Sequence, residues 1–141
     1  MRRTVAVSLK IPDNTAYTAL VALRRLGVPV ERVERSELYF FGDERDTAAL
    51  SDRVAADETI FNPNKHRLTV LERDVPGRGE VWIEPLVAPK AGPAAIAWRL
   101  FDESGGPVGR RVLAAATERL LCNPAIDRAL TGHGQAEKEE V

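Results

Sequence analysis

The chain of 141 residues is predicted to be an α/β (α+β) protein built from two related halves. Segments with period-two alternation of apolar side chains lie between segments with helical spacing, which indicates strands and helices in turn. The dipeptide Asn-Pro occurs at Asn62-Pro63 and at Asn123-Pro124, each time at the end of a helix-like run. This spacing of 61 residues indicates two similar structural units. Hydrophobic residues make up 44% and charged residues 29%, as is usual for a folded domain.

The first half begins with a strand followed by a helix. Residues 4–11 alternate between apolar and polar side chains and are rich in β-branched residues, which predicts a half-buried strand. Pro12 interrupts it, and Asp13 or Asn14 can cap the next helix by accepting hydrogen bonds from its free N–H groups. Apolar residues then recur at helical spacing up to Gly27, where the helix is expected to stop.

The rest of the first half completes a βαβαβ pattern. Residues 30–41 are predicted to form one long or bent strand, with its charged first part exposed near an edge and its aromatic second part covered on both faces. A turn at Gly42-Asp43 leads into a second helix, which places Leu50, Val54 and Phe61 inward and ends at Asn62-Pro63. The Asn is expected in the left-handed conformation that closes a helix, and the Pro prevents its continuation. Residues 66–72 are the third strand.

The second half is predicted to be a shorter ββα(β) unit. Residues 75–79 form the linker, and residues 81–87 a strand that Pro85 moves toward an edge or a bulge. A Pro-rich loop at 89–93 takes the place of the first helix, and a strand at 95–101 and a helix at 109–121 follow. Residues 126–130 are either a short strand or a further helical turn. The resulting architecture has antiparallel or mixed sheets covered by helices on one face, with units at 1–74 and 80–131 and a disordered polar tail at 132–141.

Composition excludes several classes of function. The chain has 20 Lys and Arg against 21 Asp and Glu, so its net charge of -1 gives no general attraction to nucleic acid or membrane. Cys122 is the single cysteine, which rules out an intrachain disulfide and zinc sites built on several cysteines. The N-terminus lacks the pattern of a secretory signal, and no segment reaches the roughly 20 apolar residues that span a bilayer. A cytoplasmic location is therefore expected.

No catalytic, cofactor-binding or metal-binding residues are assigned from the sequence. His66 and His133 are too isolated to form a dyad or a metal site, and His66 is interpreted as a solvent-facing or turn residue. Cys122 is interpreted as a small buried apolar residue, because the C-terminus of a helix disfavours a thiolate. The glycines of residues 105–109 precede Arg110-Arg111 at a helix start, where phosphate can bind, although turn glycines explain them without a ligand.

Two further clusters have structural interpretations. Alternating charges within residues 32–37 are typical of a solvated strand edge that resists unwanted pairing, rather than of a charged site; they are Arg32, Glu34, Arg35 and Glu37. The aromatic residues of segment 38–41, together with Trp82 and Trp98, are expected in the core. They act as a binding surface only where a partner covers them.

Two stretches of the chain resemble PurS, the small subunit of bacterial and archaeal phosphoribosylformylglycinamidine synthase. Residues 5–10, 19–20 and 23–27 are similar to that family's opening strand and helix, and residues 30–33 to its second strand. Residues 118–127 (Glu-Arg-Leu-Leu-Cys-Asn-Pro-Ala-Ile-Asp) resemble its helix-ending run Leu-Leu-Ala-Asn-Pro-x-Ile-Glu, and Asn62-Pro63 looks like a degenerate copy. The resemblance implies a divergent, tandem and pseudo-dimeric member.

Two departures from the family pattern affect expected contact surfaces. The family's Asp-Pro-x-Gly at the first helix is here Asp13-Asn14-Thr15-Ala16. Its Arg-x-Gly-Lys in the second strand is here Glu34-Arg35-Ser36-Glu37, which reverses the charge at two positions. Surfaces that dock partners through those groups are therefore expected to have changed.

The resemblance implies a non-catalytic adaptor that bridges the glutaminase and synthetase subunits of an amidotransferase in purine biosynthesis. No cofactor is implied, homo-oligomers through sheet edges are expected, and nucleic acid and membrane are not expected as partners. A regulatory, ACT-like domain that binds a small ligand between subunits is the alternative, because small βα repeats often do so. A third interpretation is a small enzyme that uses the acids Asp43, Glu44 and Asp46.

Overall fold

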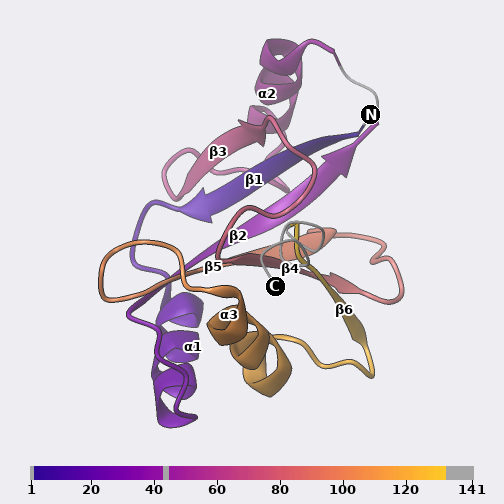
Figure 1. Cartoon of the computed structure of the whole chain (residues 1–141). Coiled ribbons are helices and arrows are strands. Elements are labelled where there is room, and N and C mark those ends of the chain that lie inside the picture. The colour runs from indigo at the N-terminus through magenta and orange to yellow at the C-terminus, as the bar shows by residue number, and fades with distance from the viewer. Residues whose placement is uncertain (1, 43–44, 133–141) are drawn as a thin grey trace.

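A computed structural model describes residues 2–42 and 45–132, and in them the chain forms one antiparallel sheet with helices packed against it (Figure 1). Six strands follow the order β3-β1-β2-β5-β4-β6. The strands are β1 (Arg3–Leu9), β2 (Arg32–Phe41), β3 (His66–Leu71), β4 (Glu80–Pro85), β5 (Ala95–Phe101) and β6 (Asp127–Leu130). The helices are α1 (Asn14–Arg25), α2 (Thr47–Ala55) and α3 (Arg110–Ala116), the last continued by a π-helical turn, η1 (Thr117–Leu121).

The predicted α/β class is confirmed, and the two halves share a single sheet. β2 and β5 join them in an antiparallel ladder that runs from Arg32 opposite Phe101 to Leu38 opposite Ala95. The connection at residues 75–79 therefore links two strands of one sheet. The hydrophobic core crosses the boundary between residues 1–74 and 80–131, because Leu23 packs in one cluster with Val81 and Leu100.

The predicted boundaries of the first helix are confirmed by its capping contacts. The side-chain oxygen Oδ1 of Asp13 accepts hydrogen bonds from the backbone N–H groups of Thr15 and Ala16, at 3.0 and 3.1 Å. Gly27 has φ of +80°, a conformation that costs little only for glycine, so the helix ends there. The second helix is shorter than predicted because α2 ends at Ala55, although Phe61 still packs against its apolar cluster.

β2 differs from its predicted place at an edge, since β1 and β5 flank it on either side. The two flanking ladders are offset, however: β1 pairs with β2 from Arg3 opposite Phe41 only as far as Val7 opposite Glu37. Residues 32–36 of β2 consequently pair with β5 alone. The charged part of the strand does border an opening, whereas Ser36 within it is buried, in contrast to the predicted exposure.

Three predictions for the second half are resolved. Residues 86–94 contain no helix, as predicted, and residues 127–130 form the strand alternative. Of the two alternatives for Pro85, an edge strand or a bulge, the edge is wrong, because β4 lies between β5 and β6. Pro85 is tolerated as the last residue of its strand, where few ladder hydrogen bonds remain to be lost.

The two Asn-Pro turns have the same hydrogen-bond pattern. The Asn62 side-chain oxygen accepts from Asn64 N at 2.9 Å, and its carbonyl accepts from Lys65 N and His66 N at 3.0 and 2.8 Å. The Asn123 side-chain oxygen accepts from Ala125 N at 3.1 Å, and its carbonyl accepts from Ile126 N and Asp127 N at 3.0 and 2.8 Å. The predicted left-handed conformation is wrong, because every non-glycine residue of the described chain has negative φ. The Asn side chain instead closes an Asx turn.

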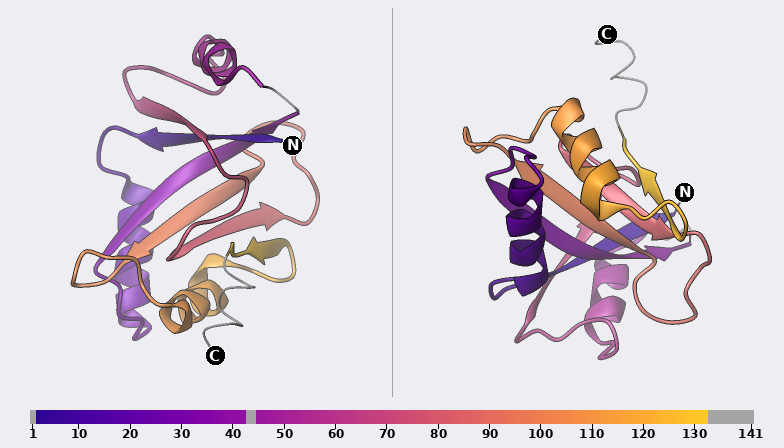
Figure 2. Two further views of the ribbon diagram at one scale, coloured as in Figure 1. Left: turned by 45° about the horizontal axis from the view of Figure 1, so that its top comes forward. Right: turned by 90° about the horizontal axis from the view of Figure 1, so that it is seen from below.

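Apolar clusters cover both faces of the sheet. Helix α2 covers β1 through Leu50 and Val54, while α1 and α3 cover β4 and β5 through residues such as Leu23 and Leu113. Because alternate strand residues share a face, the register places all three helices on one face, although the sheet's twist carries α2 to the other end of the molecule (Figures 1 and 2). The cluster on the opposite face contains no helix residue; its buried members are Ala6, Leu38, Trp82, Ala95 and Ala97.

The connection from β3 to β4 crosses this helix-free face. β3 is the outer strand at one edge, whereas β4 lies next to the other edge. Figure 2 shows the connecting segment passing over the sheet between them. Pro76 within it is fully buried, and its carbonyl oxygen lies so close to Gly132 that no Cβ would fit there.

Candidate functional site

A row of polar side chains runs across the helix-free face and joins four strands. The hydroxyl oxygens of Ser8 on β1 and Ser36 on β2 lie 2.7 Å apart. Arg99 on β5 donates from Nε to Glu34 Oε1 at 3.3 Å, and its Nη2 lies 3.5 Å from Ser36 Oγ. A second Arg99 nitrogen, Nη1, lies 3.8 Å from Oε2 of Glu80 on β4. This row crosses the junction between the two halves.

Glu80 is the most deeply buried charged member of the row, with 1% of its side chain exposed. Its Oε1 accepts a hydrogen bond from Gly77 N at 2.6 Å and lies 2.8 Å from Arg73 Nη1. Its Oε2 makes no hydrogen bond within the described part of the chain, so the more distant Arg99 is its ionic neighbour. The arrangement fixes the connection between β3 and β4 onto the sheet.

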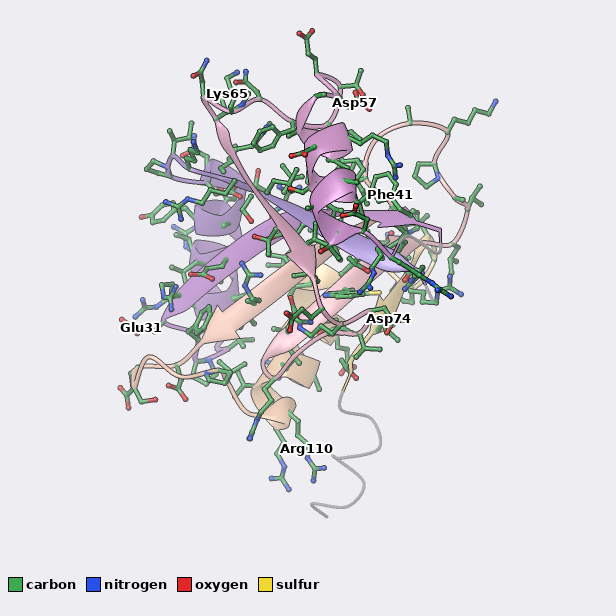
Figure 3. The ribbon with its side chains drawn as sticks, turned by 90° about the horizontal axis from the view of Figure 1, so that it is seen from above. Glu31, Phe41, Asp57, Lys65, Asp74 and Arg110 are labelled. Carbon is green, nitrogen blue, oxygen red and sulfur yellow. The ribbon has the colours of Figure 1, made fainter. Side chains whose placement is uncertain are left out.

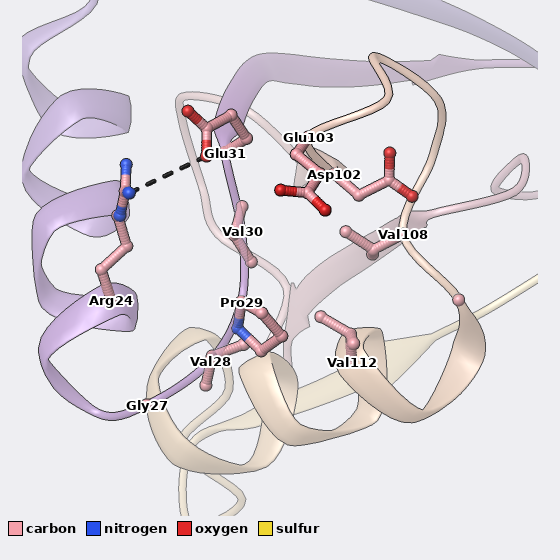
Figure 4. Close-up of a pocket in the computed structure, with 11 residues that line it drawn as sticks. Arg24, Gly27, Val28, Pro29, Val30, Glu31, Asp102, Glu103, Val108 and Val112 are labelled. Atoms are coloured by element: carbon pink, nitrogen blue, oxygen red, sulfur yellow. Dashed lines mark ion pairs between the residues drawn. The ribbon is translucent and has the colours of Figure 1, made fainter.

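A cavity of about 500 Å³ lies between the turn after α1 and the loop that precedes α3 (Figure 4). Arg24 forms an ion pair of 3.8 Å with Glu31 at its rim. Asp102 and Glu103 also line it, and hydrogen bonds from Ser104 hold the pKa of the Asp102 carboxyl below its usual range. Gly109, at the start of α3, borders the same cavity. Three carboxylates here oppose the phosphate interpretation of residues 105–109, since like charges repel.

Cys122 lines an apolar cavity of about 380 Å³ beside α3. Burial raises the pKa of the Cys122 thiol, and the carboxylate of Asp127 raises it further. A raised pKa leaves little thiolate at neutral pH, which fits the interpretation of Cys122 as an apolar residue rather than a nucleophile. Another apolar cavity, of about 430 Å³, lies between α1 and η1 above Trp98.

The remaining candidate residues do not converge on one site. His66 is the first residue of β3 rather than a turn residue, and its Nδ1 accepts a hydrogen bond from Asn62 N at 2.9 Å. Asp46 caps α2 by accepting from Ala49 N at 3.0 Å. Asp43, Glu44 and His133 lie outside the described residues, as does the predicted tail beyond Gly132.

The aromatic residues are largely core residues, as predicted. Trp82 is fully buried, and its ring centroid lies 6.1 Å from that of Phe40 on the helix-free face. Tyr39 packs beside β1 on the helix-covered face, where burial first and the neighbouring Glu37 second raise the pKa of its phenol to about 12. Charged side chains lie around this core: Asp57 and Lys65 at the end that carries α2, and Arg110 at the opposite end (Figure 3).

A polar cavity of about 400 Å³, which was not predicted from the sequence, lies where β1 ends. Ser8, Asp13 and Arg35 line it together with two arginines from other strands, Arg67 on β3 and Arg99 on β5. These residues are far apart along the chain and belong to no common motif. The charge pattern of residues 32–37 was a signal for Glu34 and Arg35 alone; only the pairing of the strands brings Ser8, Arg67 and Arg99 to them.

Within the described ranges, no helix combines the length and apolar character needed to cross a membrane. Comparison with known proteins leaves the resemblance to PurS without independent support: no family model, curated protein or solved structure matches this chain.

Proposed function

We propose that this chain is a non-catalytic adaptor subunit of the PurS type, with two family-like units combined in one polypeptide. The observation that carries the proposal is the order of the strands, β3-β1-β2-β5-β4-β6. The order reads the same from either edge when β4, β5 and β6 are taken as counterparts of β1, β2 and β3. Such mirror order is expected when two copies of one unit associate through the same strand.

The register of the outer strands supports this correspondence. His66, which follows the first Asn-Pro turn, pairs with Leu9 at the end of β1. Asp127, which follows the second turn, pairs with Pro85 at the end of β4. The next backbone contacts also correspond, because Lys10 N donates to Lys65 O at 2.7 Å and Leu86 N donates to Ile126 O at 2.8 Å.

The two units are unequal and interlocked. Helix α1 connects β1 to β2, whereas residues 86–94 connect β4 to β5 without a helix. Leu23 of α1 packs in one cluster with Leu113 and Ala116 of α3. Arg119 Nη1 also donates to the carbonyl of Leu26 at 3.0 Å. A first-half helix that depends on a second-half helix supports a monomer that replaces the family's dimer.

In this proposal the chain acts by holding partners rather than by chemistry. β3 and β6 each have one unpaired edge, which offers backbone N–H and C=O groups to another protein. The polar row links β1, β2, β5 and β4 between those edges. The proposed partners are the glutaminase and synthetase subunits of the purine-pathway amidotransferase, which implies a cytoplasmic location.

The proposal is tested by reconstitution with those two subunits. Tagged chain is mixed with purified glutaminase and synthetase, and the retained proteins are identified. Product formation is then measured with glutamine and, separately, with ammonia as the nitrogen source. We expect both subunits to be retained and only the glutamine-dependent rate to rise, because an adaptor is needed only when ammonia must pass between subunits.

Sedimentation measured on the isolated chain provides the companion test. A pseudo-dimer in one polypeptide is expected to sediment as a monomer. Failure to retain either subunit, together with an unchanged glutamine-dependent rate, would contradict the proposal. A catalytic rate in the absence of both subunits would contradict it as well.

A further inference from the structure

We propose that the polar cavity at the end of β1 binds a small molecule through a phosphate or carboxylate group. The cavity of about 400 Å³ lies within the size range of small-molecule sites. Its walls come from β1, the start of α1, β2, β3 and β5, so strands of both halves contribute to it. This inference is independent of the adaptor function and holds whether or not the amidotransferase subunits bind.

The cavity exists because two ladders of the sheet stop at different places. The pairing of β1 with β2 ends at Val7 opposite Glu37, whereas the pairing of β1 with β3 continues to Leu9 opposite His66. The chain then leaves the sheet toward Asp13 and α1. Val33, Glu34 and Arg35 of β2 therefore border an opening instead of a neighbouring strand.

The charges that line the cavity leave guanidinium groups available for a ligand. Glu34 is engaged by Arg32 and by Arg99. Asp13 uses Oδ1 to cap α1, and its Oδ2 lies 4.0 Å from Arg35 Nη1, beyond hydrogen-bond distance.

Arg35 is therefore only loosely paired, and the buried Nε of its guanidinium makes no hydrogen bond to the rest of the described chain. Arg67 lines the same cavity. Each guanidinium carries five N–H donors in a geometry that matches an oxyanion.

The second half of the molecule provides an internal comparison for Arg67. On β3, Arg67 lies opposite Ser8, whereas at the corresponding position of β6, Arg128 lies opposite Glu84. Glu84 Oε2 accepts from Arg128 Nη2 at 3.0 Å, so the second guanidinium is neutralised within the sheet. Serine at the equivalent place leaves Arg67 without that carboxylate, and only the first half retains positive charge there.

The ligand class follows from these groups. On the helix-free side of the cavity an oxyanion can accept from Arg67, and the hydroxyls of Ser8 and Thr69 offer further hydrogen bonds, while Arg35 adds positive charge from the helix-covered side. Three arginines and two carboxylates line the cavity, so its net charge is positive by one, and this favours a ligand with a single anionic group. A small metabolite with one phosphate or one carboxylate fits, whereas a polyanion would face Asp13 and Glu34.

Binding is measured by isothermal titration calorimetry with four probes: inorganic phosphate, glycerol phosphate, acetate and lactate. Comparison of the two phosphate probes with the two carboxylate probes shows which anionic group the cavity binds. Arg67→Gln removes the arginine that has no carboxylate opposite it, and Ser8→Glu places a carboxylate there, as Glu84 is placed opposite Arg128 in the second half. Arg128→Gln is the matched control, because it removes an arginine that already has its own glutamate.

We expect at least one probe to bind the wild-type chain and both cavity variants to weaken that binding about tenfold or more, as for loss of a charged hydrogen bond. Arg128→Gln should leave the affinity unchanged, and thermal unfolding curves should show that all three variants fold. The inference is overturned if no probe binds at millimolar concentration. It is also overturned if Arg128→Gln weakens binding as much as Arg67→Gln, because the effect would then be one of general charge.

Discussion

Replacement of Glu80 by Ala is expected to destabilise the fold by about 3 kcal/mol. Removing one partner of a buried ion pair costs roughly 3–5 kcal/mol, because the remaining charges lose their compensation. Here the Arg73 and Arg99 side chains are 40% and 30% exposed, so water can solvate them partly, and the lower end of that range applies. The variant also leaves the N–H of Gly77 without its acceptor.

Two further variants separate the contributions at this position. Glu80→Gln keeps an acceptor for Gly77 N but removes the charge, so the expected loss is about 1–2 kcal/mol. Glu84→Ala is the matched control on the same strand and the same face. Its partner Arg128 has 63% of its side chain exposed, and such a pair contributes less than about 1 kcal/mol.

Urea unfolding followed by far-ultraviolet circular dichroism measures these differences. For a chain of this size, a loss of 3 kcal/mol also corresponds to a fall in Tm of roughly 10 °C. The reasoning is refuted if Glu80→Ala lies within 1 kcal/mol of the wild type, or if it costs no more than Glu84→Ala. Equal losses for Glu80→Ala and Glu80→Gln would show that the hydrogen bond to Gly77 contributes nothing separable from the charge.

Three other predictions concern a titration, a turn and a repeat. Burial, followed by Glu37, raises the pKa of Tyr39 from 10.0 to about 12. The stability that the neutral phenol contributes is therefore present below pH 10 and is lost as pH rises through 12. The difference in absorbance at 295 nm between wild type and Tyr39→Phe, followed against pH, measures this pKa, and a midpoint near 10 would contradict the prediction. Gly79→Ala should cost about 2 kcal/mol or more in thermal or urea unfolding, because φ is +66° and a Cβ would lie 2.6 Å from Pro107 Cβ. Gly105→Ala has φ of +87° but open space around the added carbon, so it should cost only about 1 kcal/mol, and equal losses would exclude the steric contribution. Asn62→Ala and Asn123→Ala should each cost about 1 kcal/mol, as other side-chain caps of backbone N–H groups do, and an unaffected stability in either would show that its Asx turn is not needed.

Local patterns predicted most of the elements because their causes are local. The alternation in residues 4–11, the Asp13 cap and the stop at Gly27 each depend on residues close together in sequence. The Asn-Pro dipeptides were predicted to end two helices; this holds for Asn123, which follows η1, but not for Asn62, since α2 already ends at Ala55, and the expected backbone conformation was wrong at both. The Asn side chain can form a hydrogen bond with the backbone two residues later, and this removes the need for positive φ.

Predictions about edges failed where they required knowledge of neighbouring strands. Pro85 favoured an edge strand, yet β6 pairs with β4 after β5, α3 and η1 have intervened in the chain. The charged residues of β2 were predicted to lie at an exposed edge, yet each of them pairs with a residue of β5 along one edge of the strand. Sequence spacing does not show which strand lies beside another, because such pairs form between residues far apart in the chain.

The sequence by itself determined the class of fold, the approximate limits of most helices and strands, and the repeated turn. These properties follow from hydrophobic period, capping chemistry and the restricted backbone of Pro and Gly. Only the tertiary structure decided that the two halves join through β2 and β5 into one sheet. The offset between its ladders then brings Ser8, Arg35 and Arg67 to one cavity, because strand pairing places residues from distant segments side by side.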